Sequence, residues 1–536
     1  MKILYYITSV LFFIWIIRNV LFWIFLWQLK EYRLDRVLIH LRETGQGKKL
    51  LFSPLSIIKF LAIIAYIFVV FKNEFIFASQ IFILLIFVVQ IFFVLKDIYH
   101  HQIKRPVFTI RVLLTVFLTL GFIFLLYSIP LFEKFVWLVF LDKLTPFIVA
   151  FFVFLFYFPT ELFRDWKIDK AAQKMESFKK LTVIGVTGSY GKSSTKEYVS
   201  QILSSKFKVL KTRGTNNTPI GIANTVLNGL NKTIEVFVVE MGAYKRGEIK
   251  EMCEIVHPKI GIITAVNDQH LSLFGNIKNT IKAKYELIDS LPKNGLGLFN
   301  GNNENVSKLY EESKKKKVLY KCLSGKEISK KEYFDISAYN ILTKKNSIEF
   351  DVYLKGKTLH FKTPLIGLHN TENILPAIYV ASYLGMADEN IIDAVSNFLP
   401  LPKTMAMHKA ASGATVIDDT FNANPQAVLA TINYAKIYKG KKILIMQPMI
   451  ELGAEGNDEH YRVAKEISKI CDYLFLTNKN FYKHILKGIN DNKGKCEIKI
   501  ANSSEIAEFI NKETSKEDVV VFEGKEAGIV LNRLSF

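Results

Sequence analysis

The residues best suited to phosphate chemistry lie together in one glycine loop, Thr187-Gly188-Ser189-Tyr190-Gly191-Lys192-Ser193-Ser194. The loop follows an apolar, β-branched segment at 181–186 and precedes a helix-like segment at 195–203, which is the order of a nucleotide-binding P-loop. Glycines let backbone N–H groups close around phosphate oxygens, a lysine reaches the outer phosphates, and a hydroxyl group can bind magnesium. The pattern predicts nucleotide contacts from Thr187, Gly188, Ser189, Gly191, Lys192, Ser193 and Ser194, with Ser193 also a magnesium ligand.

Two further polar residues follow strand-like segments and suit a metal site. Glu240 ends an apolar segment that begins at Val236, and His270 comes shortly after the segment IGIIT at 260–264. An enzyme that activates a carboxylate with ATP must neutralise the triphosphate, typically with magnesium held by few protein ligands and by phosphate oxygens. Either residue could instead be a polar strand end bonded to a loop, but the P-loop beside them favours the metal role.

The glycine loop is a shorter form than the common P-loop, because the first glycine is Gly188 and position 186 is Val. This form resembles the Mur ligase family, and other segments resemble the family in the same order along 181–435. They are Thr215-Asn216-Asn217, Glu240-Met241-Gly242-Ala243, Asn267 with His270, Ala283-Lys284-Tyr285-Glu286, and Gly367-Leu368-His369-Asn370 with Asn373. The segment DDTFNANP at 418–425 is similar to the form DDSYNANP of the MurF branch. Together these weak matches indicate a MurF-like chain.

The resemblance implies an ATP-dependent amide-bond ligase of cell-wall precursor synthesis, which adds D-alanyl-D-alanine to a muramoyl peptide through an acyl phosphate. It implies that Lys192, His270 and Lys284 are catalytic. Magnesium ligands would be Ser193, Glu240, His270 and Lys284, the last as a carbamate. Asn373 and Asp419 would contact the nucleotide, and Asn216, Asn217, Asn422 and Asn424 would shape the substrate cleft. The expected cofactors are ATP and Mg²⁺.

The resemblance weakens in the last third of the chain and is absent at its start. The family's Gly-Arg should fall near Lys403-Thr404, Gln447-Pro448 replace Gly-Asp, and Glu523-Gly524-Lys525 stands where Lys-Gly-Ser is usual. In the family this region helps to bind the amine, so its specificity is open to change. The uridine-recognition domain of MurF enzymes has no counterpart, because apolar segments occupy its place.

Those apolar segments, at 3–27, 54–71, 75–95, 107–129 and 146–163, approach the length of about 20 residues that spans a bilayer. We predict five spans. The run 131–141 is too short to span alone, and it either lies at the interface or extends the last helix. Basic residues concentrate in the first and third connecting loops, which predicts that these loops and the ligase part face the cytoplasm.

Bulk composition narrows the function classes. The 536 residues carry 70 Lys and Arg against 49 Asp and Glu, a net charge of +21, but the basic residues of the polar part are spread out. A membrane surface and phosphorylated substrates explain this charge at least as well as nucleic acid, which we do not expect as a partner. Four scattered cysteines without CxxC spacing indicate neither a zinc site nor a disulfide framework.

The expected architecture is a transmembrane helical region at 1–165, a Mur ligase central ATP-binding α/β domain at 166–402, and a Rossmann-like C-terminal domain at 403–536. Residues 317–365 should form a small β element. The expected partners are a membrane and a small-molecule or lipid-linked wall precursor. Three alternatives remain: a Mur-ligase-fold enzyme with another acid and amine, a catalytically inactive membrane scaffold, and a transport ATPase, the last disfavoured because Leu323-Ser324-Gly325 lacks the Asp-Glu-ended strand that transporters need.

Overall fold

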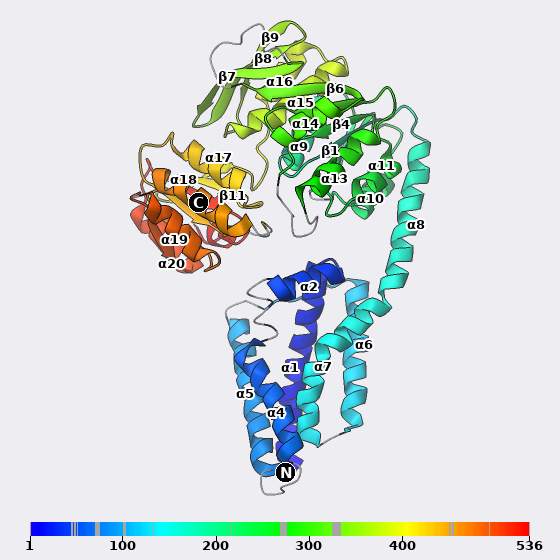
Figure 1. Ribbon diagram of the computed structural model, residues 1–536, viewed down its shortest axis with the longest axis vertical. Helices are drawn as coiled ribbons and strands as arrows, with labels where there is room; N and C mark the ends of the chain where they lie inside the picture. The colour runs from blue at the N-terminus through cyan, green and yellow to red at the C-terminus, as the bar shows by residue number, and fades with distance from the viewer. Residues whose placement is uncertain are drawn as a thin grey trace. The chain divides into compact units, whose positions relative to one another are not determined.

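The computed structural model describes residues 2–43, 47, 50, 52–69, 76–99, 103–131, 133–214, 216–267, 276–323, 334–449, 452, 455–492 and 494–534. The chain forms two compact units, Met1–Asp165 and Trp166–Phe536 (Figure 1). The first unit is helical, and the second contains two α/β domains built on separate sheets. This confirms the predicted fold class.

The first unit is built from helices, most of them apolar. They are α1 (Lys2–Leu29), α2 (Leu34–Glu43), α4 (Pro54–Val69), α5 (Ile76–Tyr99), α6 (Ile110–Ser128), α7 (Lys134–Leu155) and the start of α8 (Tyr157–Glu176). Within the described residues, four helical segments are long and apolar enough to cross a membrane: Lys2–Leu29, Phe77–Tyr99, Ile110–Ser128 and Lys134–Glu176. The predicted span at 54–71 corresponds to a shorter apolar helix, Pro54–Ala65.

The helix that contains the first part of the last predicted span, 146–163, begins before that span does. Helix α7 begins at Lys134 because the Glu133 carboxylate caps it, accepting hydrogen bonds from Phe135 N at 2.8 Å and Val136 N at 3.1 Å. Pro146 lies inside the helix and does not end it. The run 131–141 therefore extends the last helix.

One buried polar cluster joins three helices of this unit. Asp142 of α7 forms an ion pair with Lys59 of α4, and both side chains are 4% exposed. Asp142 also accepts hydrogen bonds from Trp15 Nε1 at 2.6 Å and Asn19 Nδ2 at 3.0 Å, both from α1. An ionised residue inside an apolar bundle is stable only with such partners, so this cluster fixes how the three helices pack.

The second half of α8 belongs to the α/β unit. Ala171 and Met175 are buried in a cluster with Leu181 and Val183, and Lys174 Nζ donates to the carbonyl of Val226 at 2.9 Å and to that of Leu227 at 3.1 Å. A chain that begins at the first sheet strand would therefore lose part of its core.

We expect a fragment that begins at Trp166 to be more stable than one that begins at Phe178, by about 2–3 kcal/mol, because burying a methionine side chain alone is worth about 1.5–3 kcal/mol. Urea unfolding of the two fragments measures the difference. The Trp166 fragment carrying Met175→Ala should unfold between them. Identical unfolding midpoints for all three would show that α8 adds nothing to this core.

The middle domain is built on a nine-stranded sheet of order β2-β3-β1-β4-β5-β6-β7-β8-β9. The strands are β1 (Thr182–Thr187), β2 (Val209–Lys211), β3 (Val236–Glu240), β4 (Ile260–Ile263), β5 (Leu296–Asn300), β6 (Lys316–Cys322), β7 (Ile336–Lys344), β8 (Ser347–Leu354) and β9 (Lys357–Thr363). Strands β2 to β7 pair in parallel, and β7, β8 and β9 pair antiparallel. The β element predicted at 317–365 is thus not a separate insertion but the edge of the main sheet.

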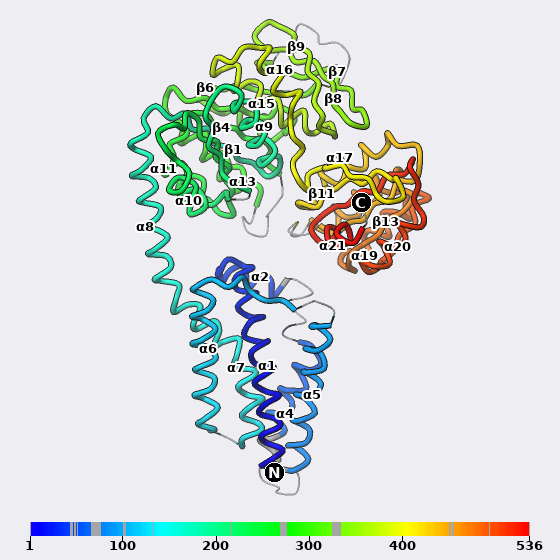
Figure 2. Tube along the Cα trace, turned by 180° about the vertical axis from the view of Figure 1, so that it is seen from behind, coloured from blue at the N-terminus to red at the C-terminus, as the bar shows by residue number. Residues whose placement is uncertain are grey.

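Two layers of helices cover this sheet, because side chains alternate between its faces along each strand. Ile184 and Val186 of β1 pack with α9 (Lys192–Ser204), α15 (His369–Tyr383) and α16 (Asp388–Ser396). Val183 faces the opposite layer, which contains α10 (Pro219–Gly229), α11 (Glu248–Val256) and α13 (Ile277–Asp289). Helix α14 (Glu304–Glu312) packs in a neighbouring cluster with Phe299 of β5. Both layers are seen from behind in Figure 2.

The C-terminal domain has a six-stranded sheet of order β10-β11-β15-β12-β13-β14, parallel except for the β10–β11 pair. Its strands are β10 (Ala406–Lys409), β11 (Thr415–Asp419), β12 (Lys442–Met446), β13 (Tyr473–Leu476), β14 (Glu497–Ile500) and β15 (Val519–Glu523). Helices α17 (Pro425–Ala435), α18 (Gly456–Ile470) and α19 (Tyr482–Asp491) cover one face, and α20 (Ser503–Glu513) and α21 (Ala527–Leu531) the other.

Candidate functional site

The candidate site lies at the carboxyl edge of the middle-domain sheet, where β1, β3 and β4 end side by side. Val186 of β1 is the register partner of Glu240 on β3, and Thr187 is the partner of Ile263 on β4. Strand β1 continues into the glycine loop. Its two neighbours in the sheet, β3 and β4, lie on opposite sides of β1. Ligands of open α/β sheets bind at such a point, outside the carboxyl ends of the strands.

Two glycines give the loop its shape. Gly188 has φ +151°, and a Cβ there would lie 2.1 Å from Thr264 Oγ1. Gly191, at φ +77°, is the residue before α9, and a Cβ there would lie 2.4 Å from Asn373 Oδ1. Both positions combine a strained backbone for other residues with a close neighbour. The loop therefore lies tightly against the segment after β4 and against α15.

The loop also holds its own lysine. Lys192 is the first residue of α9, and its Nζ donates to the carbonyl oxygens of Gly188 at 2.8 Å and Ser189 at 3.0 Å. Burial lowers the pKa of Lys192, while the Glu240 carboxylate opposes that shift. A helix N-terminus and a desolvated ammonium group together favour a phosphate anion at this place.

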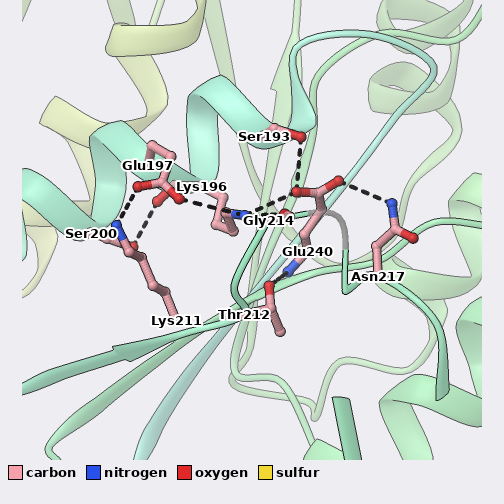
Figure 3. Close-up of polar contacts among 9 residues, drawn as sticks. All are labelled: Ser193, Lys196, Glu197, Ser200, Lys211, Thr212, Gly214, Asn217 and Glu240. Atoms are coloured by element: carbon pink, nitrogen blue, oxygen red, sulfur yellow. Dashed lines mark hydrogen bonds and ion pairs between the residues drawn. The ribbon is translucent and has the colours of Figure 1, made fainter. Parts of the chain in front are cut away.

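Glu240 is the centre of the polar network drawn in Figure 3. Its side chain is almost fully buried, and its Oε2 accepts hydrogen bonds from Ser193 Oγ at 2.9 Å and Lys196 Nζ at 3.2 Å. Its Oε1 accepts from Asn217 Nδ2 at 3.1 Å, and its backbone N–H donates to Thr212 Oγ1 at 3.0 Å. The carboxylate is thus held in one orientation beside the P-loop hydroxyl group.

Lys284 and Asn373 come from distant parts of the sequence to the same region. Lys284, on α13, is 3% exposed, and burial and then the charge of Lys192 lower its pKa to about 7, while Glu248 and Glu286 oppose that shift. Asn373 Oδ1 accepts a hydrogen bond from Thr195 Oγ1 at 3.4 Å. The structure therefore brings both residues near the glycine loop.

The predicted residues of the C-terminal domain make contacts within that domain. Asn424 caps α17, with its Oδ1 accepting from Ala427 N at 2.9 Å, and Asn422 is half-buried in the preceding loop. Asp419 ends β11 and accepts a hydrogen bond from Met405 N at 3.3 Å. Its register partner is Glu523, which ends β15, is 0% exposed and accepts a hydrogen bond from Thr431 Oγ1. A nucleotide contact of Asp419 and the substrate contacts of Asn422 and Asn424 stay predictions.

The buried carboxyl groups of Asp419 and Glu523 should make the stability of the protein depend on pH. Burial raises the pKa of Asp419 to about 7 and that of Glu523 well above its usual range. Both groups bind protons more tightly when folded, so their contribution to stability is largest below about pH 4 and is lost as the pH rises through about 7. We expect Glu523→Gln to raise the stability at about pH 8 by at least ~1 kcal/mol, since one pKa unit is worth about 1.4 kcal/mol. The melting temperature should change less between about pH 5 and 8 in the variant than in the wild type. The same pH dependence in both proteins would contradict this expectation.

The structure brings many of the predicted site residues together. The glycine loop, Glu240, Asn217, Lys284 and Asn373 come together, whereas His270 and Thr215 lie outside the described residues. Asn216 lies in the same loop as Asn217, where its N–H donates to Arg213 O at 3.0 Å. Sequence reasoning missed Lys196, Thr212 and Thr264. Only Lys196 had a signal, since it follows Lys192 by four residues and so shares its helix face.

This geometry defines a class: an α/β protein with a P-loop at the switch point of a mostly parallel sheet, followed by a second α/β domain. Residues 186–381 match the Mur ligase middle domain, and residues 405–526 match the Mur ligase glutamate ligase domain. Together the two matches cover more than half of the chain, which belongs to the Mur ligase family over these two domains. Both matches begin after the apolar helices.

Curated relatives agree with this membership. The chain is 28% identical to the UDP-N-acetylmuramoyl-tripeptide--D-alanyl-D-alanine ligase of Bacillus subtilis, over 63% of this chain and 72% of the relative. It is 28% identical to the enzyme of the same name from Escherichia coli, over 53% and 61%. The chain thus spans less than two thirds of the length of some of these relatives.

Solved structures share the fold. MurF from Acinetobacter baumannii superposes with a TM-score of 0.62 at 25% identity, covering 69% of this chain and 80% of that one. MurF from Thermotoga maritima, in complex with ADP, superposes with a TM-score of 0.60 at 24% identity, covering 69% and 82%. The α/β unit therefore has the arrangement of MurF enzymes.

Proposed function

We propose that the chain is an ATP-dependent ligase that joins D-alanyl-D-alanine to a muramoyl peptide, as the names of its relatives state for those proteins. The observation that carries the proposal is the P-loop of α9 with Ser193 and Glu240 in contact at 2.9 Å, inside the Mur ligase middle domain. The Thermotoga maritima MurF of the same fold is in complex with ADP, which supports a nucleotide as a ligand.

In this proposal the glycine loop binds the ATP phosphates, and Lys192 exchanges its two carbonyl partners for phosphate oxygens. A carboxylate oxygen of the peptide attacks the γ-phosphorus, the bond to the bridging oxygen breaks, and ADP leaves. The amine of the incoming dipeptide then attacks the acyl carbon of the acyl phosphate, the carbon–oxygen bond to phosphate breaks, and the amine loses a proton. Lys192 and the N-terminus of α9 stabilise the charge that develops at the phosphates.

The described residues also fit magnesium. Ser193 Oγ and Glu240 Oε2 are the two oxygens that would hold it, with Lys284 as a carbamate and His270 as further predicted ligands. Hydroxyl and carboxylate oxygens are what Mg²⁺ prefers, together with substrate phosphates. When bound, the ion neutralises phosphate charge. Among the described residues, no group of three or more His, Cys, Asp or Glu side chains could hold a metal by itself.

The apolar helices support a membrane location for this ligase. Four of them are long and apolar enough to cross a bilayer, counted over the described parts of the chain. Basic loops predict that the ligase domains lie on the cytoplasmic side, where ATP is supplied. The first unit then serves as a multi-pass anchor in the cytoplasmic membrane.

A product assay tests the proposal. We expect the purified full-length protein to release ADP and phosphate, in equal amounts with a new amide, only when ATP, Mg²⁺, D-alanyl-D-alanine and a muramoyl tripeptide precursor are all present. Gln447 and Glu523 stand where the family usually has other residues. The assay is therefore repeated with a panel of other amines in place of D-alanyl-D-alanine. If an amide forms only with another amine, the chain is a ligase with a different substrate. If no combination of acid and amine causes ATP turnover, the proposal that the chain is an enzyme is contradicted.

A further inference from the structure

The buried lysine Lys196 contacts the same carboxylate oxygen that is proposed to meet the metal. Its Nζ lies 3.2 Å from Glu240 Oε2, the atom that also accepts from Ser193, and both charged side chains are almost fully buried, at 1% and 2% exposure. Lys196 lies one helical turn after Lys192 on α9. Glu240 is therefore paired with a cation that belongs to the protein itself (Figure 3).

The surroundings hold Lys196 in this position. Its Nζ donates to the Gly214 carbonyl at 3.0 Å and lies 3.5 Å from Glu197 Oε1. Glu197 in turn forms an ion pair with Lys211, which is 40% exposed. Each carboxylate of the network thus has a lysine of its own, and Lys192 adds a further positive charge from the loop. Among the described residues of this network, two carboxylates stand against three lysines, so the network carries no net negative charge that would attract a divalent cation.

We propose that Lys196 is the resident counter-ion of Glu240, and that it makes metal uptake depend on the nucleotide. Without nucleotide, Lys196 satisfies the Glu240 carboxylate and the site takes up a divalent cation only weakly. The phosphates of the nucleotide supply the missing negative charge, so that the cation enters with them. This inference rests on the proposed nucleotide and metal site, and it makes Lys196 a positioning residue that never touches the substrate.

Metal binding to the nucleotide-free protein is the test, measured with full-length protein and Mn²⁺ alone by electron paramagnetic resonance. Lys196→Gln removes the positive charge and leaves Glu240 ionised beside Ser193. We expect its Mn²⁺ affinity to rise roughly tenfold or more, because a unit charge at a few ångströms in a buried site acts strongly. The melting temperature of this variant should fall without metal and recover with Mg²⁺. Lys196→Arg should keep the wild-type affinity.

Lys211→Gln is the matched control, since it removes a lysine of the same network that pairs with Glu197 and not with Glu240. It should leave Mn²⁺ binding unchanged. Unchanged binding in Lys196→Gln, with a melting temperature that Mg²⁺ does not restore, would overturn the proposal and leave Lys196 a purely structural residue.

Two further variants cover the other ways in which the test could fail. If Lys196→Gln does not fold, the double variant Lys196→Gln/Glu240→Gln should still be more stable than Glu240→Gln, in which the buried lysine loses the nearer of its two carboxylates. The reverse order would contradict the pairing. Glu240→Gln in the presence of ADP tests the underlying site. Wild-type Mn²⁺ binding in that variant would reject the metal site itself, independently of Lys196.

Discussion

Lys192→Ala should abolish nucleotide turnover in the full-length protein, lowering the rate of ADP release by about 10²–10³-fold or more, the range for removing one preorganised charge-stabilising donor. Lys192 is the first residue of α9, and its Nζ now bonds the carbonyls of Gly188 and Ser189. No other lysine of the described residues lies in the glycine loop. Loss of its charge removes the contact to the outer phosphates that the acyl phosphate step needs.

Stability should change far less than activity. Lys192 makes two hydrogen bonds to its own loop, each worth about 1 kcal/mol, and fills no apolar core. Lys206→Ala is the matched control: its Nζ also donates to a backbone carbonyl, that of Gly385 at 2.7 Å, but it lies beyond the end of α9. The control should turn over nucleotide like the wild type. Full ADP release by Lys192→Ala would place the nucleotide elsewhere in the chain.

The glycine loop could be predicted because its evidence is local. Strand, glycines, lysine and helix lie within about two dozen consecutive residues, and their spacing alone fixes the backbone that surrounds a phosphate. The partners of Glu240 could not be predicted this way. Asn217 and Lys196 reach it from two other elements, and their choice depends on the parallel register that sets Val186 opposite Glu240.

The fold shows the same division between local and distant information. The length of the apolar runs predicted the long helices of the first unit, but the start of α7 depends on a single cap, Glu133. The ion pair of Lys59 with Asp142 joins residues 83 positions apart, and no local pattern pairs them. Likewise, the sequence predicted a β element at 317–365, but only the pairing of β6 with β7 joins its later strands to the main sheet.

The second large effect concerns the apolar helices. If they place the ligase beside its acceptor, a peptide carried on a membrane lipid should be a far better substrate for the full chain than for a fragment without them. Tethering raises the effective concentration of a partner in the same bilayer and can increase apparent affinity by about 10²–10⁴-fold without any new contact. A soluble nucleotide-linked peptide gains nothing comparable.

We therefore expect the full chain, reconstituted in vesicles that contain a lipid-linked peptide precursor, to form product at least ~10²-fold faster than the fragment Trp166–Phe536 at limiting precursor. That fragment keeps Ala171 and Met175, which pack in the core of the α/β unit. Both proteins should use the soluble precursor at equal rates, which serves as the internal control. As a second control, the full chain and the lipid-linked precursor are placed in separate vesicles. Product should then form as slowly as with the fragment, because the higher rate comes from the shared bilayer and not from the helices themselves. Equal rates on the soluble precursor together with no product from the lipid-linked one would reject a lipid-linked acceptor, and the helices would then only hold the ligase at the membrane.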